Sequence, residues 1–537
     1  VHDLPQSMFG LESYVERLET LVTSEGSDAP PQYVGVWGMG GVGKTLLLQR
    51  VYASRKVHGH FQAAKFIWLT VGQTPDIMAL YRSLSEELGL KSELNVNAED
   101  YKLKLHCQFR WKRVFLVLDD VWQDEAFDSL DLAKGKGSVT LLSTRNQSLL
   151  ERASPQISQE HMTPLSKEDS WRLFCVHAFR PPSNVPCELE ALAKCMAVEC
   201  QGLPLALKVI GRAMFGKTSP EQWKLLLKRL KESRMQGRAV EALYERLKLG
   251  YDLLSEDDGR LKDCFLYFAA FPEDDEIYFK DILWHWIGEG LVPGNCGDDP
   301  RADAFSLLNK LCRRSFIESH GQVDSDEHDF LRFKVHDVMR DLAFYIVENG
   351  KPPAEQHYLY RAGQNLEAFP REWKATSMLP SVASEARRLS LHMNKLKSLP
   401  KIFCAPELVS LLIGGNPIVS LPASFLSGIP KLRVLDLSEG GFRKLPEELA
   451  SFLSNFPKLR VLDLSHGQFY SLPEELDDLK HLVCLDLSYC YNLEILPDAV
   501  GKLHLLKCLS LFECQVLEDL PSGVVGLTSL QVFDASF

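Results

Sequence analysis

The stretch Gly38-Met39-Gly40-Gly41-Val42-Gly43-Lys44-Thr45 decides how the first part of this chain folds. It matches the pattern G-x-x-x-x-G-K-[ST], with the apolar run Tyr33–Trp37 before it and the helix-forming run Leu46–Tyr52 after it. In such a strand–loop–helix unit, backbone N–H groups and the helix N-terminus converge and favour an anion. The stretch therefore predicts a phosphate-binding loop, in which Lys44 reaches the β- and γ-phosphates and the Thr45 hydroxyl binds Mg²⁺.

From residue 33 to residue 164, apolar runs alternate with helical patterns, which lie near 76–89 and 98–111. This alternation predicts βαβ units and a doubly wound parallel sheet. Ligands of such sheets lie outside the carboxyl ends of the strands, so the polar residues after each run are the candidates for a site. The apolar runs are Tyr33–Trp37, Lys65–Val71, Val114–Leu118 and Val139–Ser143.

Two of these runs end on residues that suit phosphate chemistry. Asp119 and Asp120 follow one run, and Arg145 follows another after Thr144. Downstream of a phosphate loop, a first aspartate can hold Mg²⁺ and a second can orient an attacking water. We therefore predict Asp119 as a metal ligand and Asp120 as a catalytic residue. A guanidinium at the same edge can contact a γ-phosphate, which makes Arg145 a candidate sensor; the alternative is a solvated surface arginine.

From residue 165 to residue 360 the pattern is mainly helical. Ser166–Asp169 resembles a capping box at a helix start. Pro204 interrupts a helix-like run and indicates either a contact surface or, in the simpler interpretation, a helix N-terminus. A short strand expected at Phe330–Val335, next to a helical run, suits a winged-helix module. Taken alone, His336 is more typical of a structural histidine than of a ligand.

The chain is periodic from about residue 386 onward. Copies of one leucine pattern begin at Leu432, Leu459, Leu482, Leu506 and Leu530, with a weaker copy at Leu408 and what looks like a first copy near Arg387. This periodicity predicts a leucine-rich-repeat solenoid with a concave parallel sheet. Cys490 and Cys514 occupy core positions of the repeat, so we expect them to be neither redox nor metal residues. Because the pattern is still running at Phe537, we expect further repeats beyond it.

Bulk composition limits the class of protein. The chain has 537 residues with 45% hydrophobic and 25% charged residues, as in multidomain globular proteins. Its net charge of −12 argues against binding to nucleic acid or to an anionic membrane. Thirteen cysteines without a paired framework indicate reduced thiols. With no signal-peptide pattern and no apolar run of about 18 residues, we expect a cytoplasmic location without membrane contact; the nucleus or the plasma membrane are alternatives for a full-length protein.

These patterns together predict a multidomain α/β protein. The expected parts are a lead-in at 1–32, a P-loop parallel-sheet nucleotide-binding domain at 33–164, a helical domain at 165–252, a winged-helix domain at 253–360 and incomplete leucine-rich repeats at 378–537.

The ordered set of motifs resembles the plant nucleotide-binding leucine-rich-repeat (NLR, NB-ARC) disease-resistance proteins. The motifs are the glycine loop, LDD at 118–120, STR at 143–145, GLPLAL at 202–207, CFLYFAAFPED at 264–274, VHD at 335–337 and the repeats. Trp122 directly after LDDV is similar to the coiled-coil class of that family, whose N-terminal signalling domain is absent from this chain. The match covers nearly all of the sequence.

The resemblance implies roles that spacing does not show. Phe9, Gly10 and Pro204 would surround the adenine, and His336 would reach the β-phosphate of ADP and lock a closed state. The implied function is an ADP/ATP-operated immune switch. It is closed with ADP, opens when the repeats sense a pathogen effector or a guarded host protein, and then binds ATP, forms a homo-oligomer and triggers the hypersensitive response. We expect at most slow ATP hydrolysis.

Three other functions compete with this one. A P-loop ATPase whose turnover is itself the function would hydrolyse ATP fast. A transcription regulator would use the winged helix on DNA, which the acidic charge and the lack of a basic recognition helix disfavour. A simple repeat scaffold is disfavoured by the complete phosphate-loop pattern.

Overall fold

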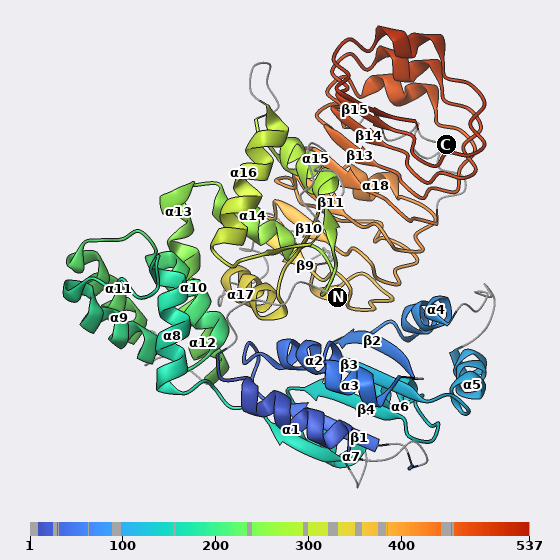
Figure 1. The fold of residues 1–537 in the computed structure, drawn as a ribbon. Coiled ribbons are helices and arrows are strands. Elements are labelled where there is room, and N and C mark those ends of the chain that lie inside the picture. The colour runs from blue at the N-terminus through green and yellow to red at the C-terminus, as the bar shows by residue number, and fades with distance from the viewer. Residues whose placement is uncertain are drawn as a thin grey trace. The chain divides into compact units, whose positions relative to one another are not determined.

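A five-stranded parallel sheet with the strand order β2-β3-β4-β1-β5 carries the glycine loop in the computed structural model (Figure 1). The chain divides into two units, Val1–Leu253 and Leu254–Phe537, and each is described by itself. The structure describes residues 9–24, 29–30, 32–62, 64–88, 98–153, 157–232, 239–293, 299–320, 331–348, 357–373, 383, 385–441, 453 and 456–535. Residues 1–8 of the lead-in, Phe330 and the expected repeat start at 378–382 lie outside these ranges.

All four apolar runs predicted as strands are strands of this sheet. The strands are β1 Gln32–Trp37, β2 Lys65–Gly72, β3 Val114–Val121, β4 Val139–Thr144 and β5 Ser158–His161. The edge strand β5 was not predicted because its sequence, SQEH, contains no apolar residue. β3 is longer than predicted and includes both Asp119 and Asp120. Helix α2 begins at Lys44, directly after the loop.

Helices cover both faces of this sheet because each face presents a row of buried apolar side chains. One core forms between the sheet and α1 to α3, with Leu18, Leu47 and Val57 among its fully buried residues. The other forms between the sheet and α4 to α7, and it includes Tyr81 and Phe127. The helices are α1 Glu12–Val22, α2 Lys44–Tyr52, α3 Arg55–His60, α4 Ile77–Glu87, α5 Ala98–Phe109, α6 Asp124–Leu130 and α7 Gln147–Ala153.

The remainder of the first unit is helical, as predicted. Ser166 caps α8 by accepting a hydrogen bond of 3.1 Å from the N–H of Asp169. Pro204 is the first residue of α10, so the simpler interpretation of that proline, a helix N-terminus, is confirmed. α10 packs against α8 and α12, and α11 packs against α9. The helices are α8 Lys167–Ala178, α9 Cys187–Glu199, α10 Pro204–Met214, α11 Pro220–Glu232 and α12 Ala239–Asp252.

The second unit begins with a winged-helix arrangement. Its three-stranded antiparallel sheet has the order β6-β8-β7, and β8 is the short strand predicted within Phe330–Val335. The elements are α13 Leu254–Asp257, α14 Leu261–Phe268, β6 Ile277–Tyr278, α15 Phe279–Glu289, α16 Pro300–Arg313, β7 Glu318–His320, β8 Arg332–Lys334 and α17 Asp337–Glu348.

The repeats form one eight-stranded parallel sheet. Its first strand, β9, pairs with β10 in the register Leu359↔Leu389. The repeat sheet therefore starts before Arg387, within the segment expected for the winged-helix domain. The sequence did not predict this strand because Leu359 is the single leucine of β9 and leaves no periodic signal. The strands are β9 Tyr358–Tyr360, β10 Arg388–Ser390, β11 Ser410–Leu412, β12 Val434–Asp436, β13 Val461–Asp463, β14 Cys484–Asp486, β15 Cys508–Ser510 and β16 Val532–Asp534. The short helices are η4 Arg371–Trp373, α18 Ala423–Leu426, η5 Glu474–Asp478, η6 Asp498–Lys502 and η7 Ser522–Gly526.

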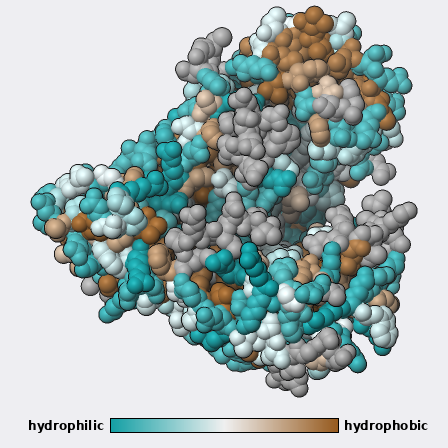
Figure 2. Space-filling view, in the orientation of Figure 1, coloured by the Kyte–Doolittle hydropathy of each residue, from teal (hydrophilic) through white to brown (hydrophobic). Residues whose placement is uncertain are grey.

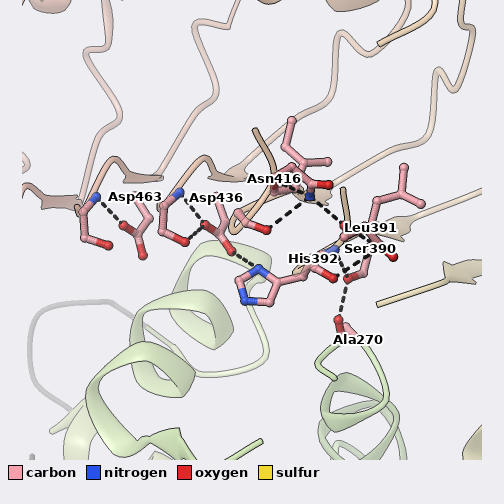
Figure 3. Close-up of polar contacts among 12 residues, drawn as sticks. Ala270, Ser390, Leu391, His392, Asn416, Asp436 and Asp463 are labelled. Carbon is pink, nitrogen blue, oxygen red and sulfur yellow. Dashed lines mark hydrogen bonds and ion pairs between the residues drawn. The ribbon is translucent and has the colours of Figure 1, made fainter. Parts of the chain in front are cut away.

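One position of several repeats supplies a polar group to the interior of the solenoid. Asn416 is 1% exposed, and its amide donates to the carbonyls of Leu391 and Ile413 at 2.8 and 2.9 Å (Figure 3). Two cysteines take the equivalent place in later repeats. The thiols of Cys490 and Cys514 are buried and donate to backbone carbonyls at 3.4 and 3.1 Å. Their prediction as core residues is confirmed.

Apolar side chains also reach the surface of the last repeats, where Figure 2 shows a group of hydrophobic residues. Val525 is 92% exposed, Val516 and Leu520 are exposed in the same repeat, and Phe533 is exposed in β16 of the next repeat. Single exposed apolar side chains are ordinary on protein surfaces, whereas these four belong to two consecutive repeats.

Candidate functional site

The carboxyl ends of β1, β4 and β3 lie next to one another because β4 pairs with both neighbours. Trp37 stands opposite Thr144, and the N–H of Gly38 donates to the Thr144 carbonyl at 3.3 Å. The glycine loop follows β1, Arg145 follows β4, and the two aspartates close β3. The tertiary fold thus places all of them at one edge of the sheet.

Two glycines of the loop are required by their surroundings. Gly43 has φ of 105°, a backbone conformation that residues with a Cβ atom rarely adopt, and it precedes the first turn of α2. A Cβ on Gly38 would lie 2.5 Å from the carbonyl oxygen of Met162. Met162 follows the edge strand β5, and its N–H donates to the Trp37 carbonyl at 2.8 Å. Sequence reasoning missed this residue because it missed β5.

Lys44 lies inside the loop that precedes it. The residue is 7% exposed, and its Nζ donates to the carbonyls of Gly38 and Met39 at 3.0 and 3.1 Å. Thr45, the next residue of α2, is exposed. Since a helix N-terminus, an ammonium group and an accessible hydroxyl meet here, these residues fit a phosphate group with a bound Mg²⁺ ion.

A serine joins the two aspartates. Asp119 is 2% exposed, and the Ser143 hydroxyl donates to its carboxylate. The same hydroxyl oxygen accepts a hydrogen bond of 2.9 Å from the N–H of Asp120. Ser143 was not among the predicted site residues, although it stands in the STR motif before Arg145. Its hydroxyl fixes the Asp119 carboxylate at the strand end, where a carboxylate fits as a ligand or water-mediated partner of Mg²⁺.

Asp120, Trp122 and Arg145 form one cluster. Asp120 has φ of 55°, a left-handed conformation that is uncommon for a residue with a side chain. Its Oδ2 accepts a hydrogen bond of 2.8 Å from Trp122 Nε1, and its Oδ1 lies 3.7 Å from Arg145 Nε. The guanidinium lies over the Trp122 ring, 4.6 Å from its centre. With 17% of its side chain exposed, Arg145 is not a solvated surface arginine.

Gly10 and the segment that precedes Pro204, both expected near the adenine, meet at Leu165. Gly10 has φ of 75°, and a Cβ there would lie 2.8 Å from the Leu165 side chain. The N–H of Leu165 donates to the carbonyl of Gly202 at 2.8 Å, two residues before Pro204 begins α10. Phe9 directly precedes Gly10 in a turn. Leu165 therefore links the two predicted segments, and a single-sequence pattern gives no signal for it.

His336 belongs to the second unit and is described within that unit alone. It precedes α17, and its carbonyl accepts hydrogen bonds from the N–H groups of Met339 and Arg340 at 2.8 and 2.9 Å. Its Nδ1 accepts a hydrogen bond of 3.2 Å from the N–H of Val338 and lies beside the Asp337 carboxylate. His336 is therefore a cap of α17.

A phosphate-type loop between a central parallel strand and a helix, with two aspartates at the carboxyl end of a further strand of the same sheet, defines a P-loop NTPase domain. In this chain it is followed by helical, winged-helix and leucine-rich-repeat parts. No helix within the described ranges is both long and apolar enough to cross a lipid bilayer.

Comparison with known proteins agrees with this class. The NB-ARC domain matches residues 12–184, the disease resistance protein winged helix domain matches residues 270–343, and a leucine-rich repeat region matches residues 407–536. The chain belongs to the nucleotide-binding leucine-rich-repeat family of plant disease resistance proteins.

Relatives from Arabidopsis thaliana are named as disease resistance proteins. The probable disease resistance protein At4g27220 is 32% identical over 440 residues, which are 78% of this chain and 44% of that protein. The disease resistance protein UNI is 28% identical over 500 residues, 90% of this chain and 52% of that protein. RPS5 is 28% identical over 458 residues, 83% of this chain and 48% of that protein. The chain thus spans about half the length of the curated relatives it matches. The coiled-coil class stays a prediction.

Among solved structures, Cdc6p from Pyrobaculum aerophilum aligns with 64% of this chain and 97% of its own at 13% identity. The TM-score of 0.31 is too low to support an argument about fold or function.

Proposed function

We propose that this chain is the nucleotide-operated part of an intracellular plant immune receptor. The observation that carries the proposal is the common edge of the sheet, where the start of α2, Asp119 and Arg145 lie at the carboxyl ends of three adjacent strands of an NB-ARC domain. The winged-helix and repeat parts in the same chain supply what a switch needs besides its nucleotide site. The domain division expected from the sequence is part of this proposal, with the repeats starting earlier, at β9.

Each site residue has a role in this proposal. Gly38, Gly40, Gly41, Val42 and Gly43 form the loop that holds the phosphates of ADP or ATP with Lys44. Thr45 and Asp119 hold Mg²⁺, which neutralises phosphate charge when bound. Asp120 orients a water for slow hydrolysis, and Arg145 contacts the γ-phosphate. Phe9, Gly10 and Pro204 lie on the adenine side, on either side of Leu165.

The switch rests on differential binding. A ligand shifts a two-state equilibrium only through a difference in its affinity for the two states. We propose that the closed state prefers ADP and the open state prefers ATP. Recognition of an effector or a guarded host protein by the repeats favours opening. The open form then assembles into a homo-oligomer. His336 is proposed to favour the ADP state.

One measurement tests the proposal first. The purified wild-type protein is denatured, and the released nucleotide is identified by ion-pair chromatography. Near-stoichiometric ADP supports a closed switch. No nucleotide, together with no binding of added ADP or ATP, contradicts the proposal, and rapid continuous hydrolysis favours an ATPase whose turnover is its function.

A further inference from the structure

Trp122 contacts both members of the Asp120–Arg145 pair. Its indole Nε1 donates to Asp120 Oδ2 at 2.8 Å, and its ring lies under the Arg145 guanidinium with 4.6 Å to the ring centre. One side chain thus holds the carboxylate by its edge and the guanidinium by its face.

The backbone explains how Trp122 comes to lie there. The left-handed Asp120, with φ of 55°, turns the chain at the end of β3, and Ser143 of β4 binds its N–H. Trp122 is half-buried, and it belongs to neither of the two hydrophobic cores described for the first unit. Its ring therefore packs at the polar edge of the sheet rather than in the interior.

Asp120 contacts Trp122 more closely than it contacts Arg145. Arg145 Nε lies 3.7 Å from Asp120 Oδ1, which is longer than a hydrogen bond, whereas the indole bond to the other oxygen is short. A guanidinium over an indole face is attracted by the ring and held in a fixed plane. The ion pair is consequently loose, and both of its members are oriented by Trp122.

We propose that Trp122 is a positioning residue that keeps Arg145 oriented and only loosely paired with Asp120, so that the terminal phosphate of a nucleoside triphosphate can take over the guanidinium. Trp122 thereby sets the preference of the site for nucleoside triphosphate over diphosphate. This inference rests on the proposed nucleotide site.

Removal of Trp122 acts on the pair in two ways. Asp120 loses the hydrogen bond from the indole and can instead accept a hydrogen bond from the Arg145 guanidinium. The guanidinium loses the aromatic ring that fixes its orientation. Both changes bring the carboxylate and the guanidinium closer together. The guanidinium N–H groups are then less available to bind a γ-phosphate. Affinity for the diphosphate, which has no γ-phosphate, is then little affected.

The test measures dissociation constants of ATP and ADP, each with Mg²⁺, on nucleotide-stripped protein. W122L is expected to weaken ATP binding about tenfold, which lies within the range for a cation–π contact, and to change ADP binding less than about twofold. W122F retains a ring but no N–H donor, so its dissociation constant for ATP should lie between those of W122L and wild type.

In an R145A background, W122L should change the ATP/ADP affinity ratio no further. W111L is the matched control, because Arg110 lies over the exposed Trp111 ring just before the other end of β3.

Two results would overturn the inference. Equal weakening of ATP and ADP by W122L would show a purely structural role, and an additive effect of W122L and R145A would show that the two side chains act separately. If wild type binds neither nucleotide, the proposed function itself is wrong. If wild type binds both and W122L leaves their ratio unchanged, only the role of Trp122 is wrong.

Discussion

The guanidinium of Arg388 lies against the carboxylate of Glu289, with Nε 2.7 Å from Oε1 and 2.8 Å from Oε2. Arg388 begins β10 and Glu289 ends α15, so the pair joins the winged helix to the repeat sheet. The rings of Tyr267 and Tyr358 lie next to the guanidinium at 4.7 and 4.8 Å. Burial alone would lower the pKa of Arg388, but the Glu289 carboxylate outweighs it and holds that pKa well above its usual value.

Breaking this pair should loosen the junction between the two parts. The side chains are only 4% and 7% exposed, so R388L leaves a buried carboxylate without its partner, at a cost of about 3–5 kcal/mol. Hydrogen exchange followed by mass spectrometry should show faster exchange in α15 and β10. The double variant E289L/R388L should recover most of the protection. R17L, which breaks the more exposed 2.8 Å pair with Glu160, should cost less than about 1 kcal/mol. Unchanged exchange in R388L would argue against this role.

A second buried pair predicts a pH dependence for the stability of the second unit. His392 Nδ1 points to Asp436 Oδ2 at 3.2 Å (Figure 3). Burial lowers the pKa of His392, but Asp436, with Asp275 and Glu439, outweighs it and raises the pKa above 6.5. Burial raises the pKa of Asp436, but His392, with His285, lowers it to about 2.

The directions of these two pKa shifts determine how stability changes with pH. The histidine contribution is complete below pH 6.5, the unfolded value, and is lost as the pH rises through the raised folded value. The aspartate contribution is complete above 3.8 and is lost as the pH falls through about 2. Exchange protection of β10 and β12 should therefore decline above pH 6.5. H392Q should flatten that decline, and H504Q, at an exposed histidine, should not. The same decline in H392Q as in wild type would refute the assignment.

Lys44 should be essential for nucleotide binding. K44A removes a charged donor to the phosphates, worth about 2–3 kcal/mol, so affinity for ADP and ATP should fall about 100-fold. T45A is the matched variant, because it should weaken the effect of Mg²⁺ while retaining metal-free ADP binding. Calorimetric titration with and without Mg²⁺ separates the two. Nucleotide retained at wild-type affinity by K44A would contradict the phosphate-loop assignment.

His336 and Asp337 should bias the switch. H336A and D337V are expected to lose ADP and to shift the protein from monomer to larger assemblies, measured by nucleotide release and by light scattering after gel filtration. H336A also removes a cap of α17, which by itself costs about 1 kcal/mol. H336N separates the two effects, since asparagine caps helices well but has no imidazole. If H336N behaves as wild type, the histidine acts only as a cap.

The fold could be predicted where its signal is local or periodic. β1 to β4 are apolar runs, and the repeats from β10 onward carry a leucine pattern, so both were found. β5 and β9 were missed because SQEH and YLY carry neither alternation nor period. Their neighbours in the sheets, β1 and β10, define them instead.

The sequence by itself determined the glycine loop, the repeat solenoid and the family, because these depend on residues close together or regularly spaced in the chain. Only the tertiary structure decided that Trp122 contacts both Asp120 and Arg145, and that Glu289 meets Arg388 across 99 positions of sequence. Such contacts are set by strand order and helix packing. No local pattern of amino acids encodes which distant side chains will meet.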